Sequence, residues 1–200
     1  LLDECKTSKL NQIKIFVEGL LAVCEGQALD IEFETKKTVS IQEYLNMINL
    51  KTGHLIGLAS ELGALTAGAD NNIRYSLRDY GRLVGRAFQI QDDYLEIFSN
   101  SNQMGKSLES DIMLGKKTYL MISALEKNDI LIREILKIAS RDFQECIEKL
   151  KSFLINEGIR EKTQLKIDNI LKDADNKIND LSINYEKLKY FSDLIKNRKY

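Results

Sequence analysis

Proline is absent from all 200 residues, although average usage would give about ten. A proline inside a helix removes a hydrogen bond and clashes with the preceding turn, so its absence favours long uninterrupted helices. Hydrophobic residues make up 44% and charged residues 30% of the chain, which is ordinary for a globular protein. This composition excludes a disordered or collagen-like chain and predicts one all-α unit over residues 1–200.

Histidine and cysteine are scarce, with a single histidine, His54, and three cysteines that form no C-x-x-C pair. These are too few ligands for a zinc site, and they indicate a reduced, cytoplasmic chain. A net charge of −1 excludes the broad basic surface that nucleic acid requires. The longest apolar tract, residues 54–69, is interrupted by Ser60 and Glu61 and is too short to cross a bilayer. We therefore expect no nucleic-acid partner and no membrane span.

Hydrophobic periodicity divides the chain into helices and one long loop. The long helices are expected over residues 4–27, 40–67 and 71–98. Ser40 and Glu43 form a capping box that opens the second of them, and a short acidic segment, residues 30–34, precedes it. Residues 99–109 carry serine, asparagine and glycine without apolar periodicity, and they are the expected functional loop. Shorter helices follow from residue 111 to residue 200, with breaks near Asn128, Gly158 and Asn179.

Lys51 falls in the middle of an apolar stripe on the second expected helix. At about 100° per residue the stripe consists of Tyr44, Ile48, Lys51, Leu55, Leu58 and Leu62. A buried ammonium loses several kcal/mol of hydration unless an anion pairs with it. Two interpretations are open: a lysine that reaches solvent or an acid of the chain itself, and a lysine that binds an anionic ligand.

The third expected helix carries an acidic face opposite its apolar stripe. This face consists of Gln89, Asp92, Asp93 and Glu96. Asp92 and Glu96 are four residues apart, so they are close enough to share a hard cation, and without one their like charges oppose the helix. Mg²⁺ is the natural candidate, because it takes one or two carboxylates and leaves its other positions to water and phosphate. A solvated acidic face is the alternative interpretation.

Lysines follow the acidic helix at Lys106, Lys116 and Lys117. Carboxylates that hold Mg²⁺ and are ringed by ammonium groups form a site for a highly charged anion such as a diphosphate. Gly105-Lys106-Ser107 is not a nucleotide-binding P-loop, because no strand precedes it.

These motifs, in this order and spacing, resemble the trans-isoprenyl diphosphate synthases, the family of farnesyl and geranylgeranyl diphosphate synthases. The matching segments are Gly26–Asp30, Lys51-Thr52, Phe88–Glu96, Gly105-Lys106, Asp111-Ile112, Lys116–Thr118 and the closing residues 188–198. The chain is similar to the C-terminal two-thirds of that family. The resemblance implies one polyprenyl synthetase domain over residues 1–200, with an all-α isoprenoid synthase bundle around a central cavity, the N-terminal helices missing, and a homodimer.

The resemblance also implies an activity, the Mg²⁺-dependent head-to-tail condensation of isopentenyl diphosphate with an allylic diphosphate to give farnesyl or geranylgeranyl diphosphate. The implied metal ligands are Asp92, Asp93 and Glu96. The implied diphosphate ligands are Lys51, Lys106 and Lys116. The implied catalytic residues, which lie where the allylic cation forms, are Lys51, Thr52 and Gln89. Preplaced cations of this kind stabilise the charge that develops on a leaving diphosphate.

The chain departs from the family pattern in three ways. Glu96 stands where the family has aspartate, and Glu109 stands where it often has glycine. The family's first aspartate-rich motif and its arginine pair do not occur in the 200 residues. A non-catalytic partner subunit of a heteromeric synthase is therefore the alternative, although its diphosphate motifs would be expected to decay, and here they are nearly intact. A terpene cyclase would need an Asn/Ser/Glu metal motif that is not present, and a purely structural helical protein would not explain Lys51.

Overall fold

The computed structural model of the protein describes residues 9–99, 112 and 116–198. These residues are helical and contain no strand, so the predicted all-α fold is confirmed. The elements are α1 (Lys9–Thr35), α2 (Ile41–Ile48), the π-helix η1 (Asn49–Gly53), α3 (His54–Thr66), α4 (Asn71–Phe98), α6 (Tyr119–Ile138), α7 (Phe143–Asn156), α8 (Ile159–Ile178) and α9 (Glu186–Asn197).

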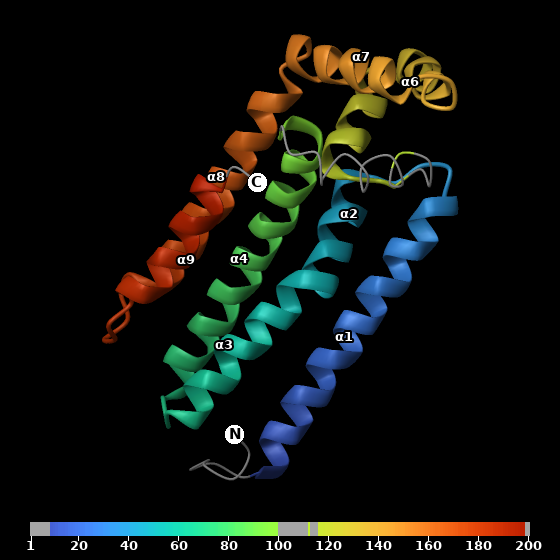
Figure 1. The fold of residues 1–200 in the computed structure, drawn as a ribbon. Coiled ribbons are helices and arrows are strands. Elements are labelled where there is room, and N and C mark those ends of the chain that lie inside the picture. Colours follow the sequence, from blue (N-terminus) through green and yellow to red (C-terminus); the bar gives the residue numbers. More distant parts are fainter. Residues whose placement is uncertain (1–8, 100–111, 113–115, 199–200) are drawn as a thin grey trace.

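Helix α4 is the central element of this arrangement. It packs against α3 on one side and α8 on the other, and α1 packs against η1 and α3. In Figure 1, α1, α3, α4 and α8 run roughly alongside one another, and α7 lies across one end of them. The main apolar core includes Ile48, Ile90 and Ile167, and a second core at the α6–α7 end includes Leu120 and Leu150.

Helix α1 continues beyond its expected end. The sequence predicted a helix to residue 27 and a non-helical acidic segment at residues 30–34, but the helix ends only at Thr35. No proline or glycine occurs between Gly26 and Thr35, and Phe33 is buried in the core, which holds the last turns in place. The prediction for this segment was wrong, and its residues belong to a rigid helix.

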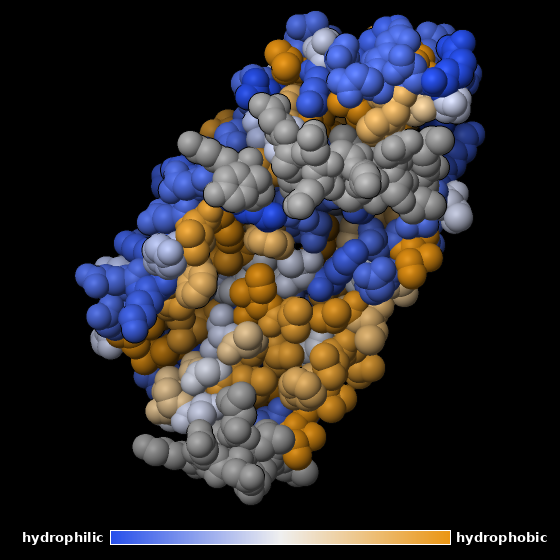
Figure 2. Space-filling model, in the orientation of Figure 1, coloured by the Kyte–Doolittle hydropathy of each residue, from blue (hydrophilic) through white to orange (hydrophobic). Residues whose placement is uncertain are grey.

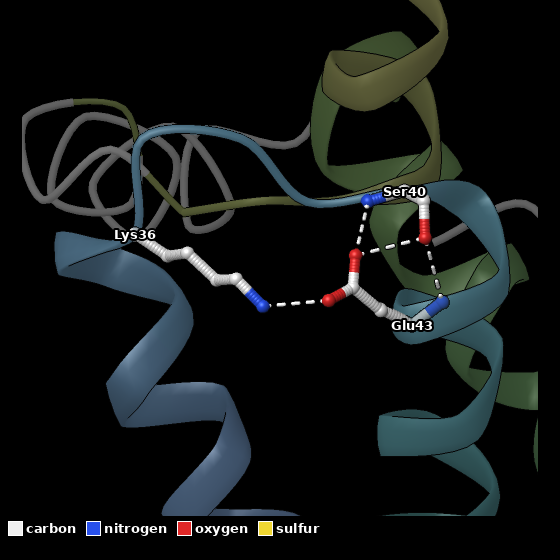
Figure 3. Close-up of polar contacts among 3 residues, drawn as sticks. All are labelled: Lys36, Ser40 and Glu43. Atoms are coloured by element: carbon white, nitrogen blue, oxygen red, sulfur yellow. Dashed lines mark hydrogen bonds and ion pairs between the residues drawn. The ribbon is translucent and has the colours of Figure 1, made fainter.

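The turn between α1 and α2 is closed by the predicted capping box (Figure 3). The backbone N–H of Glu43 donates to Ser40 Oγ at 3.2 Å, and the backbone N–H of Ser40 donates to Glu43 Oε2 at 2.8 Å. Lys36, at the end of α1, donates to Glu43 Oε1 at 2.6 Å, and chiefly through this bond the pKa of Glu43 is lowered to about 2. The predicted helix start at Ser40 is confirmed, and it fixes the point at which Tyr44 enters the core.

The second expected helix is not uniform, because the π-helix η1 interrupts it at Asn49–Gly53. A π turn bonds residues i and i+5 and so contains an extra residue, which shifts the side chains after it around the helix axis. Tyr44 and Ile48 are buried as predicted, but Leu55 is 49% exposed. The continuation of the apolar stripe to Leu55 was therefore wrong.

Several of the remaining boundaries agree with the sequence, but the end of α6 at Ile138 and the start of α7 at Phe143 were not predicted. Helix α4 covers residues 71–98 as predicted, and Asp70 caps its first turn by accepting from the N–H of Ile73. Asn128 has non-helical φ and ψ within α6, Gly158 begins α8 at a φ of 67°, and α8 ends just before Asn179. The expected functional loop lies outside the described residues, except for Ser99.

One face of α1 is apolar and exposed. Ile13, Phe16, Val17, Leu20 and Leu21 are between 41% and 64% exposed. Figure 2 shows the apolar surface that extends over α1 and α3. Contiguous exposed surface of this kind is typical of an interaction surface. Among the described helices, none combines the length and apolarity needed to cross a membrane.

Candidate active site

Gly26 determines how closely α1 approaches η1. A Cβ at this position would lie 2.3 Å from the backbone nitrogen of Lys51, far inside van der Waals contact, so the two backbones meet only because residue 26 is glycine. The contact brings Asp30, one turn further along α1, to the side chain of Lys51. Lys51 Nζ donates to Asp30 Oδ2 at 2.5 Å.

Asp30 is the anion that the sequence required for Lys51. The side chain of Lys51 is 29% exposed, and that of Asp30 is 15% exposed. Of the two interpretations left open, the structure contains the internally paired lysine. Sequence reasoning missed the role of Asp30 because it placed residues 30–34 outside any helix. The signal was present, since Asp30 follows Gly26 by one helical turn.

A chain of hydrogen bonds joins α2, η1 and α4 beside this pair. Thr52 Oγ1 donates to Gln89 Oε1 at 2.9 Å, and Gln89 Nε2 donates to Asp93 Oδ1 at 3.2 Å. Tyr44 Oη donates to the other carboxylate oxygen, Asp93 Oδ2, at 2.6 Å. The structure thus brings together Thr52, Gln89 and Asp93. It adds Tyr44, which the sequence analysis had treated only as part of an apolar stripe.

Asp93 is 3% exposed. Its pKa is raised from 3.8 to about 6, chiefly by burial and also by the charge of Asp92. The hydrogen bonds from Tyr44 and Gln89 and the charge of Lys116 act in the opposite direction. Burial also raises the pKa of Tyr44 well above its ordinary value, so Tyr44 remains a hydrogen-bond donor.

Two neighbouring hollows place lysines opposite acids. The narrower hollow is lined by Asp30, Tyr44, Met47, Ile48, Lys51, Gln89, Asp93, Lys116, Lys117 and Thr118. The wider one shares Asp93 and Lys116 with it and adds Glu96, together with apolar side chains such as Met121. Lys51 and Lys116 thus line one hollow together with Asp93. Lys106 lies outside the described residues.

The three predicted metal ligands do not converge. Asp92 Oδ1 lies 2.9 Å from Arg198 Nη1, Asp93 points into the core, and Glu96 lines the wider hollow. Adjacent residues on a helix differ by about 100° in direction, which separates Asp92 from Asp93. In the part of the chain that the structure describes, no three His, Cys, Asp or Glu side chains are placed to hold one metal ion.

The donor chemistry nevertheless suits Mg²⁺ in part. Asp92 and Glu96 are hard oxygen donors one turn apart, and Mg²⁺ needs only one or two carboxylates when water and phosphate complete its shell. Asp93 suits the role least, because Tyr44 and Gln89 already bond its two oxygens.

Family comparison agrees with this geometry. Residues 1–156 match the family model of the polyprenyl synthetases. The chain therefore belongs to the polyprenyl synthetase family, which comprises prenyltransferases.

Three relatives show how much of the chain the similarity covers. The chain is 42% identical over 124 residues to a short chain isoprenyl diphosphate synthase of Methanothermobacter thermautotrophicus, an alignment that covers 62% of this chain and 38% of the relative. It is 45% identical over 117 residues to a geranylgeranyl diphosphate synthase of Sulfolobus acidocaldarius, covering 58% of this chain and 36% of the relative. A solved geranylgeranyl pyrophosphate synthase superposes with a TM-score of 0.84 at 37% identity, covering 98% of this chain and 63% of that one. The chain thus spans less than two thirds of the length of these relatives.

Proposed function

We propose that the full-length protein is a short-chain prenyl diphosphate synthase, which condenses isopentenyl diphosphate with an allylic diphosphate, head to tail, to give farnesyl or geranylgeranyl diphosphate. The observation that carries the proposal is the convergence of Lys51 and Lys116 on one hollow with Gln89 and Asp93. The names of the relatives, which are short-chain and geranylgeranyl diphosphate synthases, support the same substrate class. The homodimer that the resemblance implies remains a prediction.

Each side chain has a distinct part in this proposal. Lys51 and Lys116, with Lys106, hold the allylic diphosphate and stabilise the charge that develops on it as it leaves. Asp30 positions Lys51. Thr52 and Gln89 direct polar groups toward the place where the allylic cation forms, and Tyr44 and Asp93 hold Gln89 in position.

Magnesium would be held by Asp92 and Glu96. When bound, Mg²⁺ supplies positive charge that helps the diphosphate to leave. We assign Asp93, the third predicted ligand, to the positioning of Gln89, because both of its oxygens accept hydrogen bonds from within the protein. Asp92 would have to exchange its ion pair with Arg198 for the metal.

The test is turnover of the full-length protein with Mg²⁺, isopentenyl diphosphate and an allylic diphosphate. We expect Lys51→Met and Asp92→Ala each to lower turnover by about 10²-fold or more while the helical circular dichroism is retained. Lys137→Met, which changes an exposed lysine on α6, is the matched control and should leave turnover unchanged. Normal turnover in Lys51→Met would contradict the proposal, and normal turnover in Asp92→Ala would remove its metal role.

A second candidate is the non-catalytic partner subunit. We expect these 200 residues to show no turnover when tested alone. If they raise the turnover of a separately purified synthase subunit instead, the partner-subunit function is the correct one.

A further inference from the structure

A second polar groove lies between α1, α3 and α4, apart from the candidate active site. Its lining includes Lys14 and Glu18 of α1, His54 and Glu61 of α3, and Arg74, Arg78 and Arg82 of α4. None of the side chains that line the two hollows of the candidate active site lines this groove. Its ionisable lining therefore has no part in the proposed prenyl transfer.

The three arginines are spaced four residues apart, which places them on one side of α4, where their like charges oppose one another. Two of them have an acid nearby. Arg74 Nε lies 3.1 Å from Glu61 Oε1, an ion pair whose direction does not suit a hydrogen bond, and Arg78 Nη2 donates to Asp79 Oδ1 at 3.2 Å. Both guanidinium groups also pack on the ring of Tyr75, at 4.4 Å for Arg74 and 4.9 Å for Arg78.

Arg82 differs from the other two. Among the described residues it has no ion pair, and its Nε is shut off from water without a hydrogen-bond acceptor. Glu61 and Asp79 act on it only through space. A buried charged donor without an acceptor costs free energy, which an incoming acceptor would recover after a small rotation of the side chain.

The fold provides a slot for the stem of Arg82. A Cβ at Gly57 would lie 2.7 Å from Arg82 Cγ, so the buried glycine on α3 makes room for the side chain as it crosses α3. The position of Arg82 therefore depends on a specific small residue and not on a chance surface rotamer.

The groove carries an excess of positive charge. Its lining includes four side chains that are cationic at neutral pH, Lys14, Arg74, Arg78 and Arg82, against the two acids Glu18 and Glu61. Burial lowers the pKa of His54, and the charges of Arg82 and Arg78 lower it further. Burial and the charge of Arg78 lower the pKa of Arg82 in the same way. Arg78 and Arg82 thus repel each other, and an anion between them would relieve that repulsion.

We propose that this groove binds a phosphoryl dianion, either inorganic phosphate or the phosphate group of a small monoester, with Arg82 as the main contact and Arg78 as the second. A guanidinium presents two parallel N–H groups that match two oxygens of a phosphate. The inference does not rest on the proposed function.

His54 makes the test direct, because it is the only histidine among the 200 residues and it lines the groove. Its imidazole C2–H proton gives one NMR signal from these 200 residues, and the loss of that signal in His54→Gln assigns it in the full-length protein. Inorganic phosphate, and in a second arm glycerol phosphate, is titrated at constant pH, with sodium chloride at matched ionic strength as the reference. We expect a saturable shift of the signal. Whichever of inorganic phosphate and glycerol phosphate has the lower dissociation constant identifies the source of the phosphoryl group.

Four variants decide the assignment. Arg82→Met should raise the dissociation constant about tenfold or more, and Arg82→Lys, which keeps the charge but loses the paired N–H groups, should raise it less. Gly57→Ala should weaken binding without removing any charge, because the added Cβ would crowd the stem of Arg82 at 2.7 Å and the backbone oxygen of Arg78 at 2.9 Å. Arg141→Met, at an exposed arginine after α6, should bind as the parent does. The same titration in Arg82→Lys and Gly57→Ala keeps the test decisive if Arg82→Met loses its helical circular dichroism.

The proposal fails if sodium chloride reproduces the shift, if the shift does not saturate, or if Arg82→Met, Arg82→Lys and Gly57→Ala all bind like the parent. It also fails if Lys51→Met abolishes the shift, because the ion would then occupy the candidate active site. Loss of turnover in Lys51→Met with an unchanged His54 titration would leave both the groove and the proposed function in place.

Discussion

Two groups of side chains on the same side of α4 present opposite situations. In the C-terminal half, Gln89 and Asp93 are joined by hydrogen bonds to Thr52 and Tyr44. In the N-terminal half, Arg82 has an Nε that bonds nothing among the described residues.

The comparison distinguishes polar side chains that are held in place by bonds within the protein from a charged side chain that lacks an acceptor. A buried polar group bonded within the protein is held in one orientation, which suits a site where a reacting molecule must be placed. A cation without an acceptor weakens the folded state, and such a cost is expected mainly where a ligand can recover it. The predictions below test each half of α4 against this interpretation.

The largest expected effect is at Glu61 of α3, which pairs with Arg74 in the N-terminal half of α4. Glu61 is 6% exposed and pairs with Arg74, so Glu61→Gln leaves a buried guanidinium without its acid. We expect the free energy of unfolding to fall by about 3 kcal/mol, measured by urea denaturation. Glu18→Gln, which affects an exposed pair with Lys14 at 3.9 Å, is the control and should cost below about 0.5 kcal/mol. Equal losses in the two variants would show that the Glu61 pair is not a buried one.

A pH-dependent effect is expected at Asp93 in the C-terminal half. Because folding raises its pKa from 3.8 to about 6, the folded protein retains a proton that the unfolded chain releases in that interval. This stabilisation is complete below the unfolded pKa and is lost as the pH rises through the folded pKa. Between about pH 4 and pH 7 the loss is on the order of 3 kcal/mol. Urea unfolding at several pH values should show this slope in the parent and not in Asp93→Asn. Parallel curves would mean that the buried carboxyl does not titrate in this range.

Tyr44→Phe should have a smaller effect on the same half. It removes the hydroxyl that donates to Asp93 Oδ2 and keeps the ring, so the cost is that of a buried carboxylate losing one donor, about 2 kcal/mol. It should also raise the pKa of Asp93 further, because the bond from Tyr44 lowers it. Tyr75→Phe keeps its contacts with the arginines and should be close to neutral in the same urea experiment. A Tyr44→Phe variant as stable as Tyr75→Phe would refute the role of this bond.

The smallest expected effect is at Thr52. Thr52→Val keeps the shape of the side chain but removes the donor to Gln89 Oε1, a bond worth about 1 kcal/mol. If Gln89 is positioned for catalysis, turnover of the full-length protein should fall by more than this change in stability explains. A loss of stability with unchanged turnover would reduce the hydrogen-bond chain to a structural feature.

The sequence was sufficient for features that depend on local chemistry. Helix α4 was predictable because Asp70 caps its start and its apolar stripe runs without interruption. The start of α2 was predictable because Ser40 and Glu43 are the first and last residues of the four-residue capping box. Both depend only on residues close in sequence, where spacing alone determines the contacts.

Features that depend on contacts between distant segments were not predictable. Asp30 became visible as the partner of Lys51 only when Gly26 allowed α1 to contact η1, across 21 residues of sequence. Tyr44 was assigned to the apolar stripe correctly, since it is 2% exposed, but its hydroxyl reaches Asp93 on another helix. The predicted metal set failed to converge because its two adjacent aspartates point in different directions, one toward Arg198 and one into the core.

Because of the π-helix at Asn49–Gly53, the orientation of Lys51 depends on the number of residues in this segment. Deleting one residue there would let the run close into an ordinary α-helix, with the same helix content, while turning everything before or after the deletion about one quarter of the way around the axis. A circular dichroism spectrum would not register such a deletion. Because Gly53 and Gly57 pack closely against α4, the rotation would also disturb that packing, and the loss would be seen in the free energy of unfolding as well as in ligand affinity.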